Sequence, residues 1–118
     1  MSAQPVASAD HPSFPMPPLT PESLRAAVAK LAPSRLAELN THLARAATQA
    51  QELDSLAPLR SFTDYWGIVV AIERDPTRAA RFHELEAIVD DGLDPEAGRA
   101  AISEIGAIVD VARAEARV

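Results

Sequence analysis

The placement of ten prolines constrains the fold of this 118-residue chain more than any other feature of its sequence. Six of them fall within residues 1–21, where each removes a backbone hydrogen-bond donor and disfavours helix in the preceding residue. Because this stretch has few large apolar residues to offset the entropy of ordering, we expect a disordered Pro-rich leader over residues 1–19. The Pro15–Pro18 spacing leaves open whether this leader is inert or binds an aromatic groove. Residues 20–118 are predicted to form a single helical domain.

Pro21 and the four prolines that follow it mark helix boundaries. Three helix starts pair a capping side chain with a proline in the first turn, and these are Thr20-Pro21, Asp75-Pro76 and Asp94-Pro95. Ser34 is expected to cap the second helix, Asp54 and Ser55 offer the cap of the third, and Gly92 suits a left-handed helix end. The predicted helices run from Pro21 to Pro33, from Ser34 to about Glu52, from Ser55 to Asp75, from Pro76 to Gly92, and from Pro95 to near the C-terminus.

Apolar residues recur on these helices at spacings of three and four, which is typical of helices with one buried face. The predicted core consists of Leu36, Leu39, Leu43, Leu59, Phe62, Trp66, Val69, Phe82, Leu85, Val89, Ile102, Ile105 and Val109. Residues 66–72 are apolar nearly all round, which predicts a central helix, although their β-branched side chains also permit a strand. The sequence therefore predicts an all-α, four- to five-helix bundle whose last two helices form a hairpin.

The net charge of −6 falls in the second half of the chain, where residues 61–118 hold twelve acidic and six basic side chains. This sign is wrong for displacing counterions from nucleic-acid phosphates, so nucleic acid is disfavoured and a basic protein partner is favoured. Solubility alone would also explain the acidity. The candidate partner-binding residues are Tyr65, because aromatic side chains dominate interface hot spots, and the acidic Glu84, Asp90, Asp91 and Asp94.

The residue types that most enzymes and metal proteins need are scarce. The absence of cysteine excludes disulfides, thiol nucleophiles and Cys-ligated metals, and four glycines are too few for phosphate-binding loops. His83, Glu86 and Asp90 share one helix face and could hold a divalent ion, but a solvated polar flank is the preferred interpretation. We therefore expect no enzymatic activity, no cofactor and no metal. The longest apolar run is too short for a membrane span, so a cytoplasmic location is expected.

The stretch from Arg35 to Pro76 resembles a family of small, uncharacterised helical proteins from GC-rich Gram-positive bacteria. The matching features are the Ala/Leu/acid helix from Arg35 to Glu52, the run Leu53-Asp54-Ser55-Leu56-Ala57-Pro58-Leu59, Trp66 eight residues after the proline, and Asp75-Pro76 nine residues after the tryptophan. In that family a second aromatic tends to follow the tryptophan, where this chain has Gly67. The family is similar to antitoxins in size and acidity, by analogy only, and the resemblance carries no activity.

Together these features predict a non-enzymatic protein–protein interaction module, either antitoxin-like or a regulatory partner of a basic protein. A homodimer is a further option. The alternative is a helix-turn-helix-type DNA-binding regulator built from the last two helices. Recognition helices present basic or amide side chains near their N-terminus, whereas the last helix opens with Glu96-Ala97-Gly98-Arg99 and so has one basic residue beside an acidic one.

Overall fold

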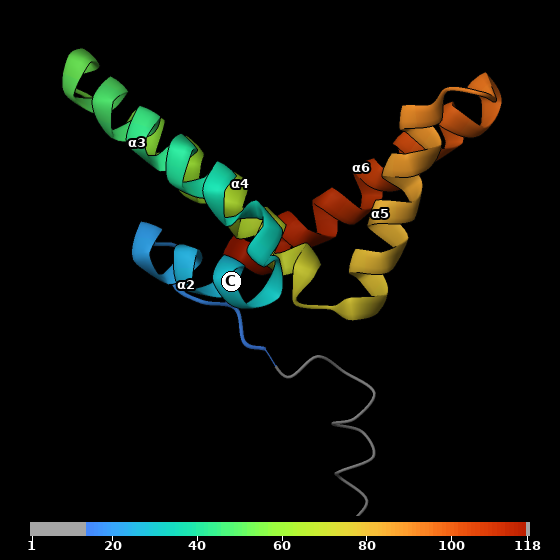
Figure 1. Cartoon of the computed structure of the whole chain (residues 1–118), viewed down its shortest axis with the longest axis horizontal. Helices are drawn as coiled ribbons and strands as arrows, with labels where there is room; N and C mark the ends of the chain where they lie inside the picture. Colours follow the sequence, from blue (N-terminus) through green and yellow to red (C-terminus); the bar gives the residue numbers. More distant parts are fainter. Residues whose placement is uncertain (1–13, 118) are drawn as a thin grey trace, which may run out of the picture.

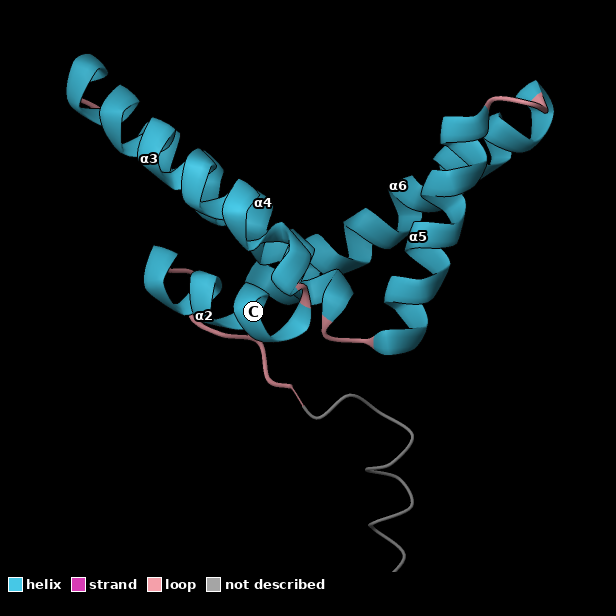
Figure 2. Cartoon of the chain, viewed as in Figure 1, coloured by secondary structure: helices cyan, strands magenta, loops and turns pink. Residues whose placement is uncertain are grey.

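The computed structural model describes residues 14–117, which contain five α-helices, one 3-10 turn and no strand (Figure 2). These elements are α2 (Pro21–Leu31), the 3-10 turn η1 (Pro33–Arg35), α3 (Leu36–Leu53), α4 (Ala57–Glu73), α5 (Pro76–Asp91) and α6 (Pro95–Arg117). The predicted all-α class is confirmed. The apolar segment of residues 66–72, whose composition also permits a strand, is helical and belongs to α4.

Most helix boundaries lie where the caps place them. Thr20, Asp75 and Asp94 each accept a hydrogen bond from backbone N–H groups in the first turn of the helix that follows. Gly92 ends α5 with a φ of +59°, the left-handed conformation that glycine adopts without strain. The prediction that Ser34 caps α3 is wrong, because Ser34 lies within η1, which leads into α3 without a side-chain cap.

The chain has the shape of a V (Figure 1). One arm is the hairpin formed by α3 and the first half of α4, and the other is the α5–α6 hairpin. The arms share a base, in which α4 packs against α2, α3, α5 and α6. Within residues 14–117, α3 contacts neither α5 nor α6. The predicted bundle is therefore open, and its two hairpins diverge from one central helix.

The second half of α4 forms the centre of the base, as predicted from residues 66–72, which are apolar nearly all round the helix. Trp66, Val70 and Ala71 are fully buried. Gly67 lies at a close approach of α4 to two other segments, since a Cβ added there would be 2.9 Å from Leu19 Cδ2 and 3.5 Å from the Cβ of Ala116 on α6. An aromatic side chain at position 67 would not fit this close approach.

Burial follows the V shape. The core prediction is confirmed for five fully or nearly fully buried residues, which are Leu39, Phe62, Trp66, Val69 and Leu85. Seven others are partly buried, and these are Leu36, Leu43, Leu59, Phe82, Val89, Ile105 and Val109. The prediction is wrong for Ile102, which is 58% exposed. It lies on the part of the α5–α6 arm that no third helix covers.

The segment before α2 packs onto the base. Phe14, Met16 and Leu19 are partly buried against the core, and Arg74 donates a hydrogen bond to the Phe14 carbonyl oxygen at 3.4 Å. Residues 14–19, predicted to belong to the disordered leader, are therefore docked, because their apolar side chains alternate with prolines and reach the α2–α4 core. The rest of the predicted leader, residues 1–13, lies outside the described residues.

A cluster of ion pairs in the base of the V joins the C-terminal part of α6 to the end of α4 and the start of α5. The Glu115 carboxylate of α6 accepts hydrogen bonds from Arg78 at 2.7 and 2.9 Å and from Arg74 at 2.9 Å. Arg78 also donates to the Ala71 carbonyl oxygen near the end of α4, at 3.0 Å. The hydrogen bonds from Arg78 and, to a smaller extent, Arg74 lower the pKa of Glu115 to about 2. These contacts fix the end of α6 against the junction of α4 and α5.

Candidate functional site

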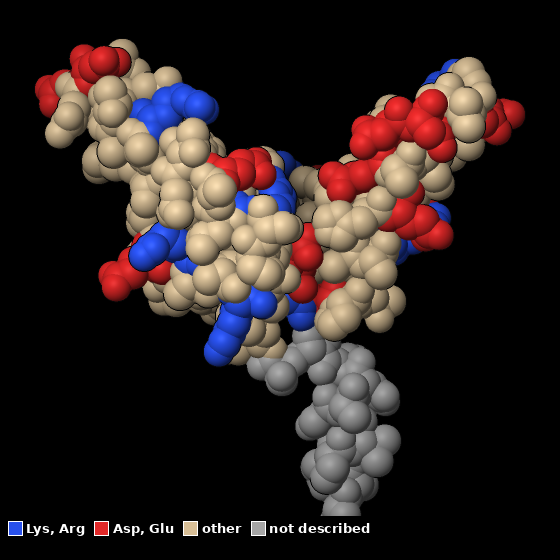
Figure 3. Space-filling view, in the orientation of Figure 1, with Lys and Arg blue, Asp and Glu red and all other residues tan. Residues whose placement is uncertain are grey.

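A cleft of about 410 Å³ lies at the inner angle of the V, where α4, α5 and α6 converge. Figure 3 shows the molecule hollowed between the two arms. The floor of the cleft is apolar and is formed by Ile68, Val69, Ile72, Phe82 and Val109. Its rim is polar and consists of Arg35, Tyr65, Glu73, His83, Glu86 and Arg113. This combination suits a ligand with an apolar body and polar or charged edges.

Tyr65 stands on the α4 side of the rim, where it is 45% exposed. Its hydroxyl oxygen accepts a hydrogen bond from Arg35 at 2.9 Å, and the Arg35 guanidinium lies 4.9 Å from the centre of the Trp66 ring. Two further hydrogen bonds tie Arg35 to Glu38 and raise the pKa of the guanidinium. Tyr65 thus presents its ring to solvent while its hydroxyl is fixed, as expected of an interface anchor.

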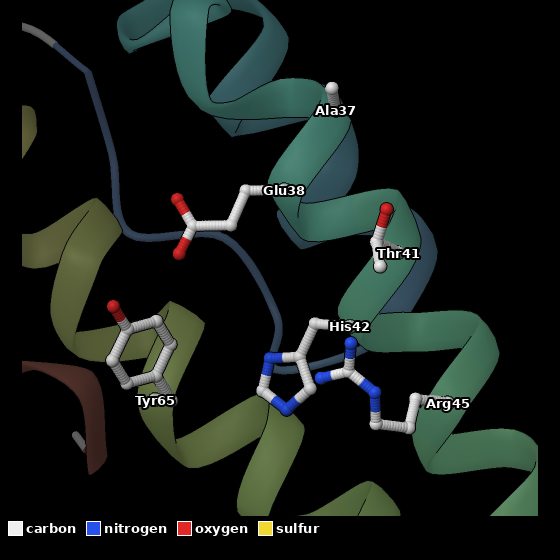
Figure 4. A pocket seen from close by; sticks show the side chains of 6 residues that line it. All are labelled: Ala37, Glu38, Thr41, His42, Arg45 and Tyr65. Carbon is white, nitrogen blue, oxygen red and sulfur yellow. The ribbon is translucent and has the colours of Figure 1, made fainter.

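A second hollow, of about 440 Å³, lies on the other side of Tyr65, against α3. Figure 4 shows its lining, in which Glu38, Thr41, His42 and Arg45 of α3 stand opposite the Tyr65 ring. Trp66 donates a hydrogen bond from Nε1 to Nδ1 of His42 at 2.9 Å. This bond places the imidazole proton on Nε2. His42 therefore acts as the hydrogen-bond acceptor for the N–H group of a buried indole.

His83 occupies the α5 side of the cleft rim between two carboxylates. Its Nε2 lies 2.7 Å from Glu73 of α4, and its Nδ1 lies 2.9 Å from Glu86 of α5. Both partners accept hydrogen bonds, so both ring nitrogens donate and the charged imidazolium is favoured. The pKa of His83 is accordingly raised, first by the hydrogen bond to Glu86 and then by Glu73.

The face of α5 that carries His83, Glu86 and Asp90 is thus a solvated flank with an ion pair across the helix junction. No group of three or more His, Cys, Asp or Glu side chains within residues 14–117 is arranged to hold a metal ion.

The structure separates the five predicted partner-binding residues. Tyr65 lies at the cleft, whereas Glu84, Asp90, Asp91 and Asp94 lie along the α5–α6 arm toward its tip. Asp91 and Asp94 accept backbone hydrogen bonds in the turn between α5 and α6, and so also have structural roles. Figure 3 shows the acidic side chains gathered on this arm. Residues 84–96 hold six acidic side chains and no basic one, so the formal charge of this segment, −6, equals the net charge of the whole protein.

Sequence reasoning missed Arg35 and His42. Arg35 reaches Tyr65 across 30 positions of sequence, and Trp66 reaches His42 across 24. The one local signal is that His42 follows Leu39 by three residues, which places it at the border of the buried face of α3.

The described helices contain no segment long and apolar enough to cross a membrane. A comparison of the chain with protein-family models, curated proteins and solved structures finds no match.

Proposed function

We propose that this protein is a non-enzymatic interaction module that holds a segment of another protein in the cleft between its two arms. The observation that carries the proposal is the cleft itself, with an apolar floor formed by three helices beneath the exposed ring of Tyr65. Protein interfaces combine an apolar centre, aromatic anchors and a polar rim in this way.

The charge of the α5–α6 arm supports a basic partner. Of the six carboxylates in residues 84–96, Glu84 is paired with Arg81 and Glu86 with His83. The other four form no ion pair among the described residues and create a negative potential on the outer part of the arm, and these are Asp90, Asp91, Asp94 and Glu96. Such a potential attracts a positively charged protein and speeds association in a salt-dependent way. A regulatory or antitoxin-like role, in which the acidic module covers a functional surface of a basic protein, is the form of this function that we propose.

The same charge disfavours the DNA-binding alternative, because the N-terminus of α6 would bring Asp94 and Glu96 toward the phosphates. The pairing of ionisable groups at the cleft rim favours binding over catalysis. Both ring nitrogens of His83 are engaged by carboxylates, and Arg35 is engaged by Glu38 and Tyr65.

The proposal is tested by site-specific photo-crosslinking in the cells that produce the protein. A photoreactive phenylalanine analogue replaces Tyr65 in one variant and Ala107 in a control. Ala107 is exposed on the face of α6 opposite Val109, away from the cleft. We expect position 65, and not position 107, to crosslink to one defined protein that mass spectrometry identifies. Equal labelling from both positions, or none from position 65, would refute a protein-binding cleft.

Two follow-up measurements separate the forms of the function. Co-expression with the crosslinked protein shows whether the module suppresses its activity or toxicity, as an antitoxin-like role requires. A gel shift with DNA from upstream of the protein's own coding region tests the alternative. Retardation at micromolar protein would support the DNA-binding alternative and oppose the interaction module.

A further inference from the structure

We propose that the segment held in the cleft is a basic amphipathic helix, which lies along the α5–α6 arm with its apolar face on Val109 and Ile102 and its cations on Glu86 and Asp90. This inference rests on the proposed function and adds the chemistry of the partner. It follows from the uncovered face of the arm, from the charges beside that face, and from the space that the V leaves open.

An apolar surface continues from the cleft along the arm. Val109 forms part of the cleft floor, and Ile102 lies on the same face of α6 two turns away, with 58% of its surface exposed. Leu93, at the tip, is 86% exposed. By contrast, Val111 is 51% exposed on the opposite face of α6. The surface from Val109 to Ile102 spans about 10 Å, or two helical turns.

Carboxylates border this apolar surface on the α5 side. Glu86 lies at the rim of the cleft, and Asp90 follows it by one turn on the same side of α5. Asp90 forms no ion pair with any residue between 14 and 117, and Glu86 is paired only with His83 in that range. Lys and Arg suit such a border because their aliphatic stems cover apolar surface while their charged ends reach carboxylates.

A helix fits the geometry of the arm. A two-helix hairpin leaves one face without a partner. A third helix would cover this face if its axis lay about 8–10 Å from the axes of the hairpin, the usual distance between packed helices. The V leaves room for one, since α3 contacts neither α5 nor α6 within the described residues. A third helix in that position would bury Ile102 and extend the packing that already exists in the base.

A second copy of this chain is a poor occupant. Pairing two α5–α6 arms face to face would bring together eight carboxylates that have no ion pair among the described residues, since in each copy Glu84 and Glu86 are paired with Arg81 and His83. The eight are Asp90, Asp91, Asp94 and Glu96 of each copy. Repulsion between like charges at an interface disfavours such a dimer and favours an oppositely charged partner.

The test uses three synthetic peptides of about 18 residues, a length of about 27 Å as a helix. The first has Leu at helical spacing and Lys at the flanking positions, the second has Glu in place of Lys, and the third has the composition of the first in scrambled order. Methyl NMR of the full chain follows binding. We expect the basic peptide alone to shift the Ile102 and Val109 methyl signals, to leave Val111 unshifted, and to bind at least about tenfold more weakly when salt rises from low to physiological concentration.

Matched variants locate the site. Ile102→Ser should weaken binding of the basic peptide at least about tenfold, equal to about 1.4 kcal/mol, whereas Val111→Ser should change it less than about twofold. Glu86→Gln with Asp90→Asn should weaken it by a similar factor. A control pair of substitutions makes the same change of net charge by replacing two acidic residues of α2 and α3 with Gln, and it should leave binding of the basic peptide unchanged. These control residues are Glu22 and Glu52.

Several results would overturn the inference. They are equal affinity for the basic and scrambled peptides, binding of the acidic peptide, equal weakening by the two charge-matched pairs, and a dimer in sedimentation that Ile102→Ser dissociates. Crosslinking from position 65 without binding of the basic peptide would reject the helix and leave the proposed function standing. Failure of both experiments would reject both.

Discussion

The hydrogen bond between Trp66 and His42 gives the most direct test of how the base of the V is stabilised. Trp66 is fully buried, and its Nε1 donates to His42 Nδ1 at 2.9 Å. Trp66→Phe keeps an aromatic ring and removes the donor. The lost hydrogen bond should cost about 1 kcal/mol, and the lost volume of the indole about another 1 kcal/mol. Trp66→Ala sets the upper limit, at about 3–5 kcal/mol.

His42→Leu probes the same bond from the other side. It leaves the indole N–H buried and without an acceptor, at a cost of about 1–3 kcal/mol. In the double variant Trp66→Phe/His42→Leu the donor is gone as well, so this penalty disappears. The two substitutions should therefore be non-additive, with a coupling free energy of about 1–2 kcal/mol. His83→Leu is the control histidine variant, because His83 is paired with carboxylates instead, and its coupling to Trp66→Phe should be near zero.

Urea unfolding, monitored by far-ultraviolet circular dichroism, measures all of these free energies without relying on tryptophan fluorescence. A coupling below about 0.3 kcal/mol would mean that the hydrogen bond contributes nothing to the base. A cost of Trp66→Ala below about 1 kcal/mol, as at surface sites, would refute the assignment of Trp66 to the core.

Three further predictions concern ionisation and backbone packing. The pKa of Glu115 is about 2, below its ordinary 4.5, so its ion pairs stabilise the fold above pH 4.5 and are lost as the pH falls toward 2. In urea unfolding, Glu115→Gln should lower the free energy of unfolding by about 2 kcal/mol at neutral pH and by little near pH 2. The hydrogen bonds to Glu86 and Glu73 raise the pKa of His83, so its contribution to stability is full below pH 6.5 and fades as the pH rises through that raised pKa. The stability difference between wild type and His83→Gln should therefore shrink as the pH rises above 6.5, and a growing difference would contradict this. Gly67→Val should lower the thermal midpoint because its side chain would collide with Leu19, whereas Gly106→Ala, with no atom within 4 Å of the added Cβ, should stabilise the helix by about 1 kcal/mol.

The helix boundaries could be predicted because the interactions that set them are local. Asp75 and Asp94 accept hydrogen bonds from residues two and three positions ahead, and Gly92 adopts a backbone conformation that its own lack of a Cβ permits. The local prediction failed at Ser34 because this residue belongs to a 3-10 turn that begins at Pro33, whose fixed φ suits the first position of such a turn.

Burial could be predicted only in part, because periodicity identifies residues that share a face and says nothing about what covers that face. Leu39 and Ile102 both stand on regular apolar stripes, yet Leu39 is fully buried and Ile102 is 58% exposed. The difference is their position along an arm. Leu39 lies in the core cluster that α2, α3 and α4 form at the base, and Ile102 lies on the α5–α6 arm outside both core clusters. The cleft was unpredictable for the same reason, since its lining comes from segments that only the angle between the arms brings together.

That angle depends on the smallest side chains of the chain. Ala71 of α4 and Ala112 of α6 are fully buried in one cluster, and Gly67 and Ala116 meet one turn from each. Small residues at i and i+4 on both helices let the backbones approach closely at one point, and straight helices that cross at such a point must separate on either side of it. The alanine content of the sequence, 24 residues of 118, therefore has a role beyond helix propensity. Larger side chains at the crossing would hold α4 and α6 apart, change the angle between the arms and reshape the cleft. Under the proposed function, substitutions here should therefore alter binding of the partner without contacting it.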